Sequence, residues 1–383
     1  MKRRHLLGLA AAAPWVAQGQ APGRSEGDGN TIVVGQSAPI SGPGQHFGIE
    51  YTRGLKLRLD AANASGGVNG RRIDLVTYDD QYEAETAAFN TADLITSDKA
   101  FALIGYVGAE MALRSLAVPQ AAGVPFIAPL SGAEVFRGPT QRNVINFRPS
   151  HAAEVGALVR QMSIMSVRKV ATLVQSDSDG RGLLESLRTA LASEHIQLVA
   201  EAETERNSTI NVTLNFRDIK AAVAKLLAKQ PDVIVFLTAH ATAAQAIREA
   251  RAGGFKGSFY ATSLGSAAGI AKLLAEMVRG VVVSQVVPWP FGTTRAVVND
   301  YRAALGTTAP DHTSLEGWLV GAMTVEALRR CGANLTRARF MDAMLGLGTL
   351  DLGGFGLNMQ PARRQASSFV ELTIMDDKGR VLR

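Results

Sequence analysis

Short apolar runs alternate with amphipathic stretches along almost the whole chain. The first runs, at residues 32–35 and 73–76, flank a loop of small residues at 37–44 and a helical pattern that ends at Ala64. This order predicts a strand, a loop, a helix, a turn and a second strand, which together form a parallel β-α-β unit. Such a unit leaves a ligand-sized crevice at the carboxyl ends of its strands.

The same alternation continues past residue 80. Further apolar runs of strand length stand at 101–104, 126–128, 144–147, 170–174, 197–200, 233–237, 258–260 and 281–283. Helical periodicity fills the intervals, at 83–97, 111–122, 152–165, 182–192, 219–229 and 242–252, and then dominates at 295–305, 315–330 and 336–344 before a last strand at 369–374. Buried runs of this kind are typical of parallel sheets that helices cover on both faces. We predict an α/β fold with two doubly wound parallel-sheet lobes, joined by several short crossings because no Pro/Gly/Ser-rich linker separates them.

The first 21 residues have the layout of an export signal. Basic residues at 2–4 precede an apolar centre at 6–13 and small residues at 17–21. The paired arginines fit a twin-arginine signal; a general secretory signal stays open, as does cleavage after Gly19 or Ala21. The apolar centre is far shorter than the ~20 residues that span a bilayer. We therefore predict an exported, periplasmic protein.

Composition narrows the function classes. The 383 residues suffice for two domains of ordinary size. Three of the basic residues behind the formal net charge of +6 lie in the leader, and the rest are too scattered to predict nucleic-acid binding. Cys331 is the only cysteine and the histidines show no i, i+4 pairing, so no internal disulfide, metal site or cofactor is expected.

The chain lacks the motifs of two enzyme classes. A dinucleotide-binding enzyme needs G-x-G-x-x-G directly after the first strand, whereas this loop reads Ser41-Gly42-Pro43-Gly44. A hydrolase of the α/β type needs G-x-S-x-G at a strand-to-helix turn, and the chain has none. We predict a binding protein with no catalytic residues.

Several segments in their order resemble a known family. Residues 32–80, Gly105-Tyr106, and the stretches at 129–137 and 250–254 are similar to type I periplasmic solute-binding proteins, above all the Leu/Ile/Val receptor-like branch that serves ABC importers. The resemblance covers the whole chain after the leader. It implies two lobes joined by three crossovers, with 31–147 plus 286–345 in lobe 1 and 148–285 plus 346–383 in lobe 2. It also implies a monomer that binds a small-molecule solute between the lobes and delivers it to a membrane permease.

The resemblance also implies where the solute's carboxylate binds. In the family, two lobe 1 loops hold it through backbone N–H groups and hydroxyls at helix starts, which suit an anion. The corresponding residues here are Tyr106, Gly108, Ala109, Leu130, Ser131 and Gly132. The family's usual hydroxyls are missing at Ala109 and Gly132, whereas Ser131 keeps one. The alternative is that these loops only turn the chain.

The remaining site residues follow from the same resemblance. Phe47 stands where the family has an aromatic wall, and Thr238 ends a strand that should face the cleft. Asp179 takes a place where the family often has a tyrosine, or else caps the following helix. Ser263 aligns with the family's acidic partner for an α-ammonium group. Without that acid a buried ammonium lacks its counter-charge unless Asp179 supplies it, so acids or amides are expected to bind better than leucine, isoleucine or valine.

One alternative function stays open at this point. A ligand-sensing protein of the same fold would report to a membrane receptor instead of feeding a permease. The chain itself does not separate transport from sensing, and it does not name the ligand.

Overall fold

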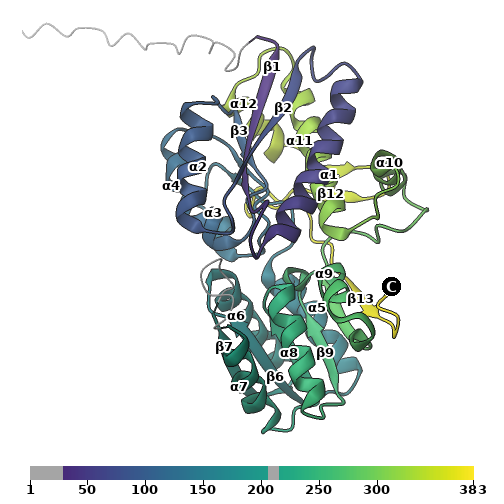
Figure 1. The fold of residues 1–383 in the computed structure, drawn as a ribbon. Coiled ribbons are helices and arrows are strands. Elements are labelled where there is room, and N and C mark those ends of the chain that lie inside the picture. The colour runs from purple at the N-terminus through teal and green to yellow at the C-terminus, as the bar shows by residue number, and fades with distance from the viewer. Residues whose placement is uncertain (1–28, 206–214) are drawn as a thin grey trace, which may run out of the picture.

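The computed structural model describes residues 29–205 and 215–383, and it folds into two lobes stacked one above the other (Figure 1). The expected export signal lies outside the described residues. In the described part of the chain the backbone passes between the lobes three times: after β5, after β10 and before β13. The α/β class with two parallel-stranded sheets, expected from the alternation of apolar runs, is confirmed.

The first lobe is built on a parallel five-stranded sheet of order β2-β1-β3-β4-β5. This is the doubly wound order that places a crevice at the carboxyl ends of the strands. Its elements are β1 (Thr31–Ala38), α1 (Gln45–Ala64), β2 (Arg72–Asp79), α2 (Ala84–Thr96), β3 (Ala102–Ile104), α3 (Ala109–Ser115), α4 (Ala117–Ala121), β4 (Phe126–Ile127), a 3₁₀ turn (Glu134–Arg137) and β5 (Val144–Ile145).

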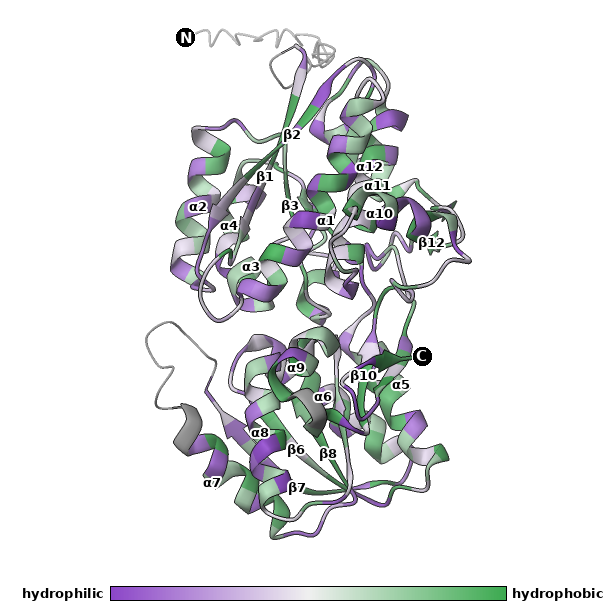
Figure 2. Ribbon diagram, turned by 45° about the vertical axis from the view of Figure 1, so that its right-hand side comes forward, coloured by the Kyte–Doolittle hydropathy of each residue, from purple (hydrophilic) through white to green (hydrophobic). Residues whose placement is uncertain are grey.

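The second lobe repeats this plan. Its sheet has the order β14-β13-β10-β9-β8-β6-β7, in which β13 and β14 run antiparallel at one edge. Figure 2 shows β6 and β8 running as hydrophobic strands between helices whose outer faces are hydrophilic. The elements are α5 (His151–Ile164), β6 (Lys169–Gln175), α6 (Ser178–Ser193), β7 (Gln197–Thr204), α7 (Asn215–Leu227), β8 (Val233–Leu237), α8 (His240–Ala252), β9 (Ser258–Ala261), α9 (Ala267–Leu274), β10 (Val281–Gln285), β13 (Glu371–Met375) and β14 (Val381–Leu382).

The chain returns to the first lobe after β10. Helices α10 (Ala296–Leu305), α11 (His312–Cys331) and α12 (Arg337–Leu345) precede a hairpin of β11 (Thr349–Asp351) and β12 (Gly356–Asn358). The expected boundary placed residues 346–383 in the second lobe. Apolar side chains of the hairpin region are instead buried in the core around β1, α1 and α11: Leu347, Phe355, Leu357, Met359 and Ala366. The segment therefore belongs with the first core up to the start of β13.

Two glycines bring α1 and α11 into close contact. A Cβ on Gly54 would lie 1.7 Å from the Ser314 carbonyl oxygen, and one on Gly317 would lie 2.1 Å from the Tyr51 carbonyl oxygen. Each helix thus presses backbone against backbone where the other has no side chain. This contact fixes the start of α11, and with it Glu316, beside the junction of the lobes.

Three local features differ from the expected elements. The helix expected at 111–122 is two helices, α3 and α4, because Pro119 lacks the N–H that would continue the ladder. Helix α6 begins at Ser178, four residues before the expected start at 182, and α9 was not expected at all. Within the described residues, no helix combines the length and hydropathy that a bilayer crossing requires.

Candidate functional site

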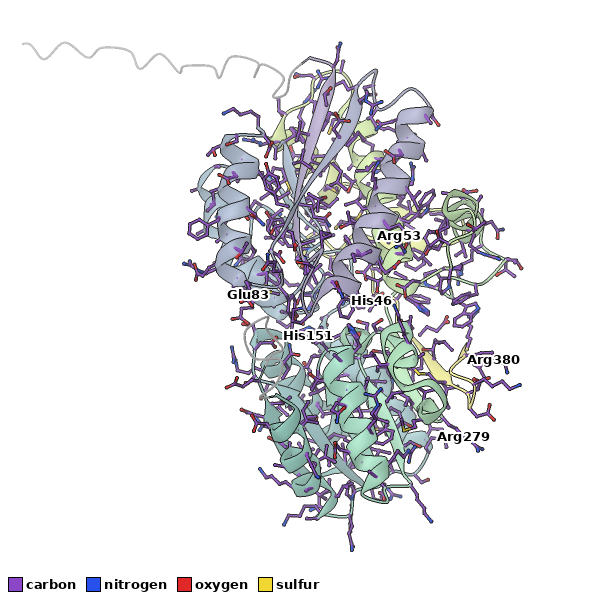
Figure 3. All side chains as sticks on the ribbon, in the orientation of Figure 1. His46, Arg53, Glu83, His151, Arg279 and Arg380 are labelled. Atoms are coloured by element: carbon purple, nitrogen blue, oxygen red, sulfur yellow. The ribbon has the colours of Figure 1, made fainter. Side chains whose placement is uncertain are left out.

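The carboxyl ends of both sheets face the junction between the lobes. The loops after β1, β3 and β4 reach it from the first lobe, and the starts of α5, α6 and α8 reach it from the second. Figure 3 shows His46 and His151 at this waist, pointing into the space between the lobes. The junction is therefore the place where side chains from both lobes meet.

A carboxylate from the second lobe is bound by the first. The Ala109 N–H donates to Asp179 Oδ2 at 2.6 Å, and the Ser131 hydroxyl donates to Asp179 Oδ1 at 2.5 Å. All three residues are buried, with Asp179 only 3% exposed. We call the Ala109 N–H and the Ser131 hydroxyl the anion seat.

Local backbone geometry builds the anion seat. Gly108 precedes α3 with a φ of +85°, a conformation that residues with side chains rarely adopt. Ala109 is the first residue of the helix, so its N–H has no partner within the helix and can bind an anion. The Leu130 N–H donates to the Tyr106 carbonyl at 2.7 Å, which ties the two loops together. The Ser131 hydroxyl accepts from the Ala133 N–H, so its proton is aimed at Asp179.

Asp179 is not the cap of its helix. Asp177 is the N-cap of α6 and accepts from the Gly180 N–H at 2.8 Å, whereas Asp179 sits in the first turn and reaches across the junction. A Cβ on Gly180 would lie 1.9 Å from the Gln175 carbonyl oxygen, so glycine there lets α6 start directly against the end of β6. This close start carries Asp179 forward to the anion seat.

The pKa values of the two carboxylates in this turn are shifted in opposite directions. Burial alone would raise the pKa of Asp179, but hydrogen bonds from His151, Ser131 and Ala109 outweigh it and hold the pKa below its ordinary value. Burial and the neighbouring anion of Asp179 raise the pKa of Asp177 to about 6. Asp179 therefore keeps its charge to lower pH than Asp177 does.

His151 also lies against the Asp179 carboxylate. Its Nε2 atom lies 3.2 Å from Asp179 Oδ1 and 3.1 Å from the backbone nitrogen of Gly132. A neutral Nε2 accepts from the Gly132 N–H, whereas a protonated Nε2 donates to Asp179, so the tautomer decides which partner it serves. The His151 N–H in turn donates to the Gly132 carbonyl at 2.8 Å, which joins the lobes independently of the imidazole.

Three rings from both lobes meet at the junction. His46 and Phe47, at the start of α1, lie 5.4 and 5.6 Å from the His240 ring at the start of α8, in edge-on geometry. His46 Nε2 is also 2.9 Å from the Ser266 hydroxyl. Burial and the neighbouring His46 lower the pKa of His240 to about 4, so this imidazole is neutral at neutral pH. Phe47 and the neutral His240 ring thus form an apolar wall at the junction.

A buried ion pair lies on the other side of the junction. Arg148, in the first crossing between the lobes, donates to both carboxylate oxygens of Glu316 at 2.9 and 2.5 Å and to the Ser263 hydroxyl at 3.2 Å. The Ser263 N–H donates to Glu154 at 3.0 Å, and the Ser284 hydroxyl donates to the same oxygen at 2.8 Å. Ser263 is thus held between a cation and an anion of the protein.

A small cavity lies at the junction. A cavity of about 10 Å³ remains between the start of α11 and the loop after β9, lined in part by Arg148, Ser263, Ser266, Asp311 and Glu316. That volume is about what a single water needs. A solute of amino-acid size therefore enters this cavity only if the lobes move apart.

The structure places the sequence-predicted residues in different surroundings. Phe47, Ala109, Ser131, Gly132, Asp179 and Ser263 all make contacts between the lobes or with the crossing segment. Tyr106 instead turns its side chain into the first lobe, where its hydroxyl lies 2.8 Å from that of Thr91. Gly108 and Leu130 contribute through the backbone, and the Thr238 hydroxyl donates to the adjacent Ala239 carbonyl at 3.3 Å, within its own lobe.

Sequence reasoning missed several residues of the junction: His46, Arg148, His151, Glu154 and Glu316. Arg148 directly follows a buried strand run, which is a usable signal because the carboxyl end of a strand faces the crevice. Glu154 and Glu316 lie within helical stretches, where acidic residues are ordinarily exposed. Among the described residues, no group of three or more His, Cys, Asp or Glu side chains is arranged to hold a metal ion.

Comparisons with known proteins identify the family and agree with the two-lobed fold. A family profile described as "Periplasmic binding protein" matches residues 31–380. The chain is 27% identical over 232 residues to an amino acid binding protein of Pseudomonas aeruginosa, covering 60% of this chain and 59% of that one. It is 25% identical over 268 residues to Leu/Ile/Val-binding protein homolog 7 of Brucella abortus, covering 67% and 62%. The matched region thus spans about 60% of these curated relatives.

A solved structure extends the likeness to nearly the full length. The crystal structure of a possible leucine/isoleucine/valine-binding protein from Rhodopirellula baltica superposes with a TM-score of 0.85 at 26% identity. The match covers 93% of this chain and 97% of that chain, so both lobes are included.

Proposed function

The chain belongs to the periplasmic binding protein family, and we propose that it is the exported solute receptor of an ABC importer. In this proposal it holds one small solute between its lobes, closes on it like a hinge and presents it to a membrane permease. The solute is a small carboxylate, an amide or an amino-acid-like compound. No chemistry is performed on it.

The observation that carries the proposal is the anion seat itself. Its two donors already bind a carboxylate, that of Asp179, at 2.6 and 2.5 Å in a buried site. Charge-assisted hydrogen bonds of this kind are about twice as strong as neutral ones. Donors placed at the junction of two movable lobes are what a receptor needs to grip the acidic or carbonyl end of a solute.

The surroundings of the seat support a solute with an apolar body. The Phe47 and His240 rings meet at the same junction of the lobes, and the pKa of His240, lowered to about 4, leaves that imidazole without charge at neutral pH. Ser263 offers no carboxylate to an ammonium group, and its hydroxyl instead receives a hydrogen bond from Arg148. We therefore propose acids or amides without an α-ammonium as better solutes than leucine, isoleucine or valine.

A ligand screen tests the proposal directly. The protein without its leader is mixed with aliphatic and aromatic acids, their amides and the matching amino acids, and unfolding is followed by thermal shift. A solute at a hundred times its Kd adds about 2.7 kcal/mol to the free energy of unfolding. Small-angle scattering of the same samples should show compaction on binding. Chemical conversion of a bound compound, followed by mass spectrometry, would contradict a receptor role.

A pair of phenylalanine variants locates the site. Phe47→Leu removes the ring that faces His240, so the affinity for the best acid or amide should fall roughly threefold to tenfold. Phe89→Leu changes a side chain on α2 that is 72% exposed, and should leave affinity unchanged. Equal affinities of the two variants, measured by calorimetry, would place the solute away from this wall.

A further inference from the structure

We propose that Asp179 is a built-in competitor of the solute: its carboxylate takes the anion seat, latches the lobes together and must leave before a carboxylate solute binds. This inference rests on the proposed function for the identity of the competitor, whereas the latch itself rests only on contacts within the chain. It makes Asp179 the residue that sets how strongly acidic solutes are held.

The latch follows from where the partners lie. Asp179 belongs to α6 of the second lobe, whereas Ala109 and Ser131 belong to loops of the first lobe. Both carboxylate oxygens are engaged, one by a backbone N–H and the other by a hydroxyl. Because no peptide segment ties α6 directly to these loops, the two hydrogen bonds exist only when the lobes are closed. They are buried and charge-assisted, and therefore favour closure.

Competition follows from the same atoms. A solute carboxylate on the anion seat would need the Ala109 N–H and the Ser131 hydroxyl, and a hydroxyl has a single proton to donate. A second carboxylate within hydrogen-bond reach of Asp179 would also repel it, and this repulsion is strong in a buried site. An acidic solute and Asp179 therefore exclude each other.

A different role for Asp179 predicts opposite results. If Asp179 were the counter-charge of a solute ammonium, removing it would weaken the binding of an amino acid. The latch instead predicts that removing it strengthens the binding of an acid. The two roles are separated by comparing leucine with 4-methylpentanoate, which has the same body and carboxylate but no ammonium, and with 4-methylpentanamide.

The first experiment measures closure without any solute. Spin labels on Thr96→Cys in α2 and Ser193→Cys in α6, in a Cys331→Ala background, report the distance between the lobes by pulsed electron resonance. Asp179→Ala should shift the distances to longer values. Glu185→Gln removes one negative charge from an exposed position of the same helix and should not. A wild-type distance distribution in Asp179→Ala would overturn the latch.

A second latch variant guards against a general loosening of the protein. Ser131→Ala removes one donor of the seat and should lengthen the distance in the same direction. Asp179→Ala combined with Ser131→Ala should open the lobes no further than Asp179→Ala alone, because both changes remove the same interaction. Additive opening would mean that the two residues act separately and would refute the latch.

The second experiment measures affinity by calorimetry. Asp179→Ala should bind 4-methylpentanoate about tenfold tighter or more than wild type, since the solute no longer displaces a doubly hydrogen-bonded carboxylate. Glu185→Gln should match wild type, and adding Ser131→Ala to Asp179→Ala should remove most of the gain. Unchanged acid affinity in Asp179→Ala, or a tenfold loss of leucine affinity, would overturn the competition.

Failure of this inference is distinguishable from failure of the proposed function. If none of the three solutes, nor any other in the screen, binds wild type or variant, the proposed function fails. The distance measurement still decides whether Asp179 latches the lobes. If solutes bind but Asp179→Ala changes neither distance nor acid affinity, the receptor role stands and the latch falls.

Discussion

The buried pair of Arg148 and Glu316 offers a sharp test of how the junction is stabilised. Both side chains are nearly inaccessible, and their two hydrogen bonds measure 2.9 and 2.5 Å. Desolvation of Arg148 works against its charge, but the attraction of Glu316 outweighs it and raises the pKa of Arg148. Removing one partner leaves a buried charge alone, so Arg148→Met or Glu316→Leu should each lower the free energy of unfolding by about 3–5 kcal/mol.

The double variant tests whether the loss of stability comes from a buried charge without its partner. With Arg148→Met and Glu316→Leu together both members of the pair are removed. The nearby Glu154 carboxylate keeps its hydrogen bonds from Ser263 and Ser284, so stability should return to within about 2 kcal/mol of wild type. Urea unfolding of the four proteins measures the coupling energy, provided that the slope with urea stays constant.

An exposed pair with nearly the same geometry provides the control. Arg188 and Glu201 are joined by hydrogen bonds of 2.9 and 2.5 Å at the surface. The matching cycle there should give a coupling of at most about 1 kcal/mol, because solvent screens the charges. Similar coupling energies for the two pairs would refute the reasoning that burial, and not hydrogen-bond geometry, determines the cost.

Further predictions concern packing, acid stability and a helix end. Gly317→Ala should lower the free energy of unfolding by about 3 kcal/mol or more, because its Cβ would lie 2.1 Å from a carbonyl oxygen of α1. The control is Gly156→Ala on α5, whose Cβ would meet only a flexible arginine tip at 3.3 Å. It should be neutral or slightly stabilising in the same urea titration. Burial lowers the pKa of His240 to about 4 from 6.5, so the unfolded chain takes up this proton first as pH falls from 7 to 4. Stability should therefore drop by about 2–3 kcal/mol across that window, and His240→Phe should flatten the pH dependence of the urea midpoint. Asn69 donates to carbonyls at the end of α11 at 3.0 and 3.1 Å, and Asn69→Ala should cost about 1 kcal/mol by the same assay.

The fold was largely predictable because parallel strands buried on both faces leave a clear pattern. The run at 233–237 is apolar without interruption and the run at 170–174 is broken only by Thr172, and the structure finds them as β8 and β6, both interior strands of a sheet. Helix starts were harder to place. The first turn of α6 is polar and contains Gly180, whose low helix propensity argues against a helix, yet only glycine permits the close approach to β6.

Assignment of the segment after α12 failed for a different reason. The hairpin of β11 and β12 has few residues and weak periodicity, so no local signal says which core it joins. Its buried side chains, Leu357 and Phe355 among them, pack on the first core through tertiary contacts alone. Helix α9 was missed because it has only eight residues, and a short, mainly apolar run of that length does not distinguish a helix from a strand.

The candidate site was also only partly predictable from the sequence. One half of the anion seat is a backbone N–H, which every residue except proline carries, so its presence depends on where α3 begins and not on the side chain of Ala109. The other half, Ser131, was recognisable by type. What the sequence left open was the partner, since an aspartate near a helix start caps helices far more often than it crosses a domain junction. Asp177 takes the capping role here, and that frees Asp179 for the seat. The pairing of a capping aspartate with a second aspartate two residues later, at the start of a helix in the opposite lobe, is therefore the feature by which a related chain with an occupied anion seat would be recognised.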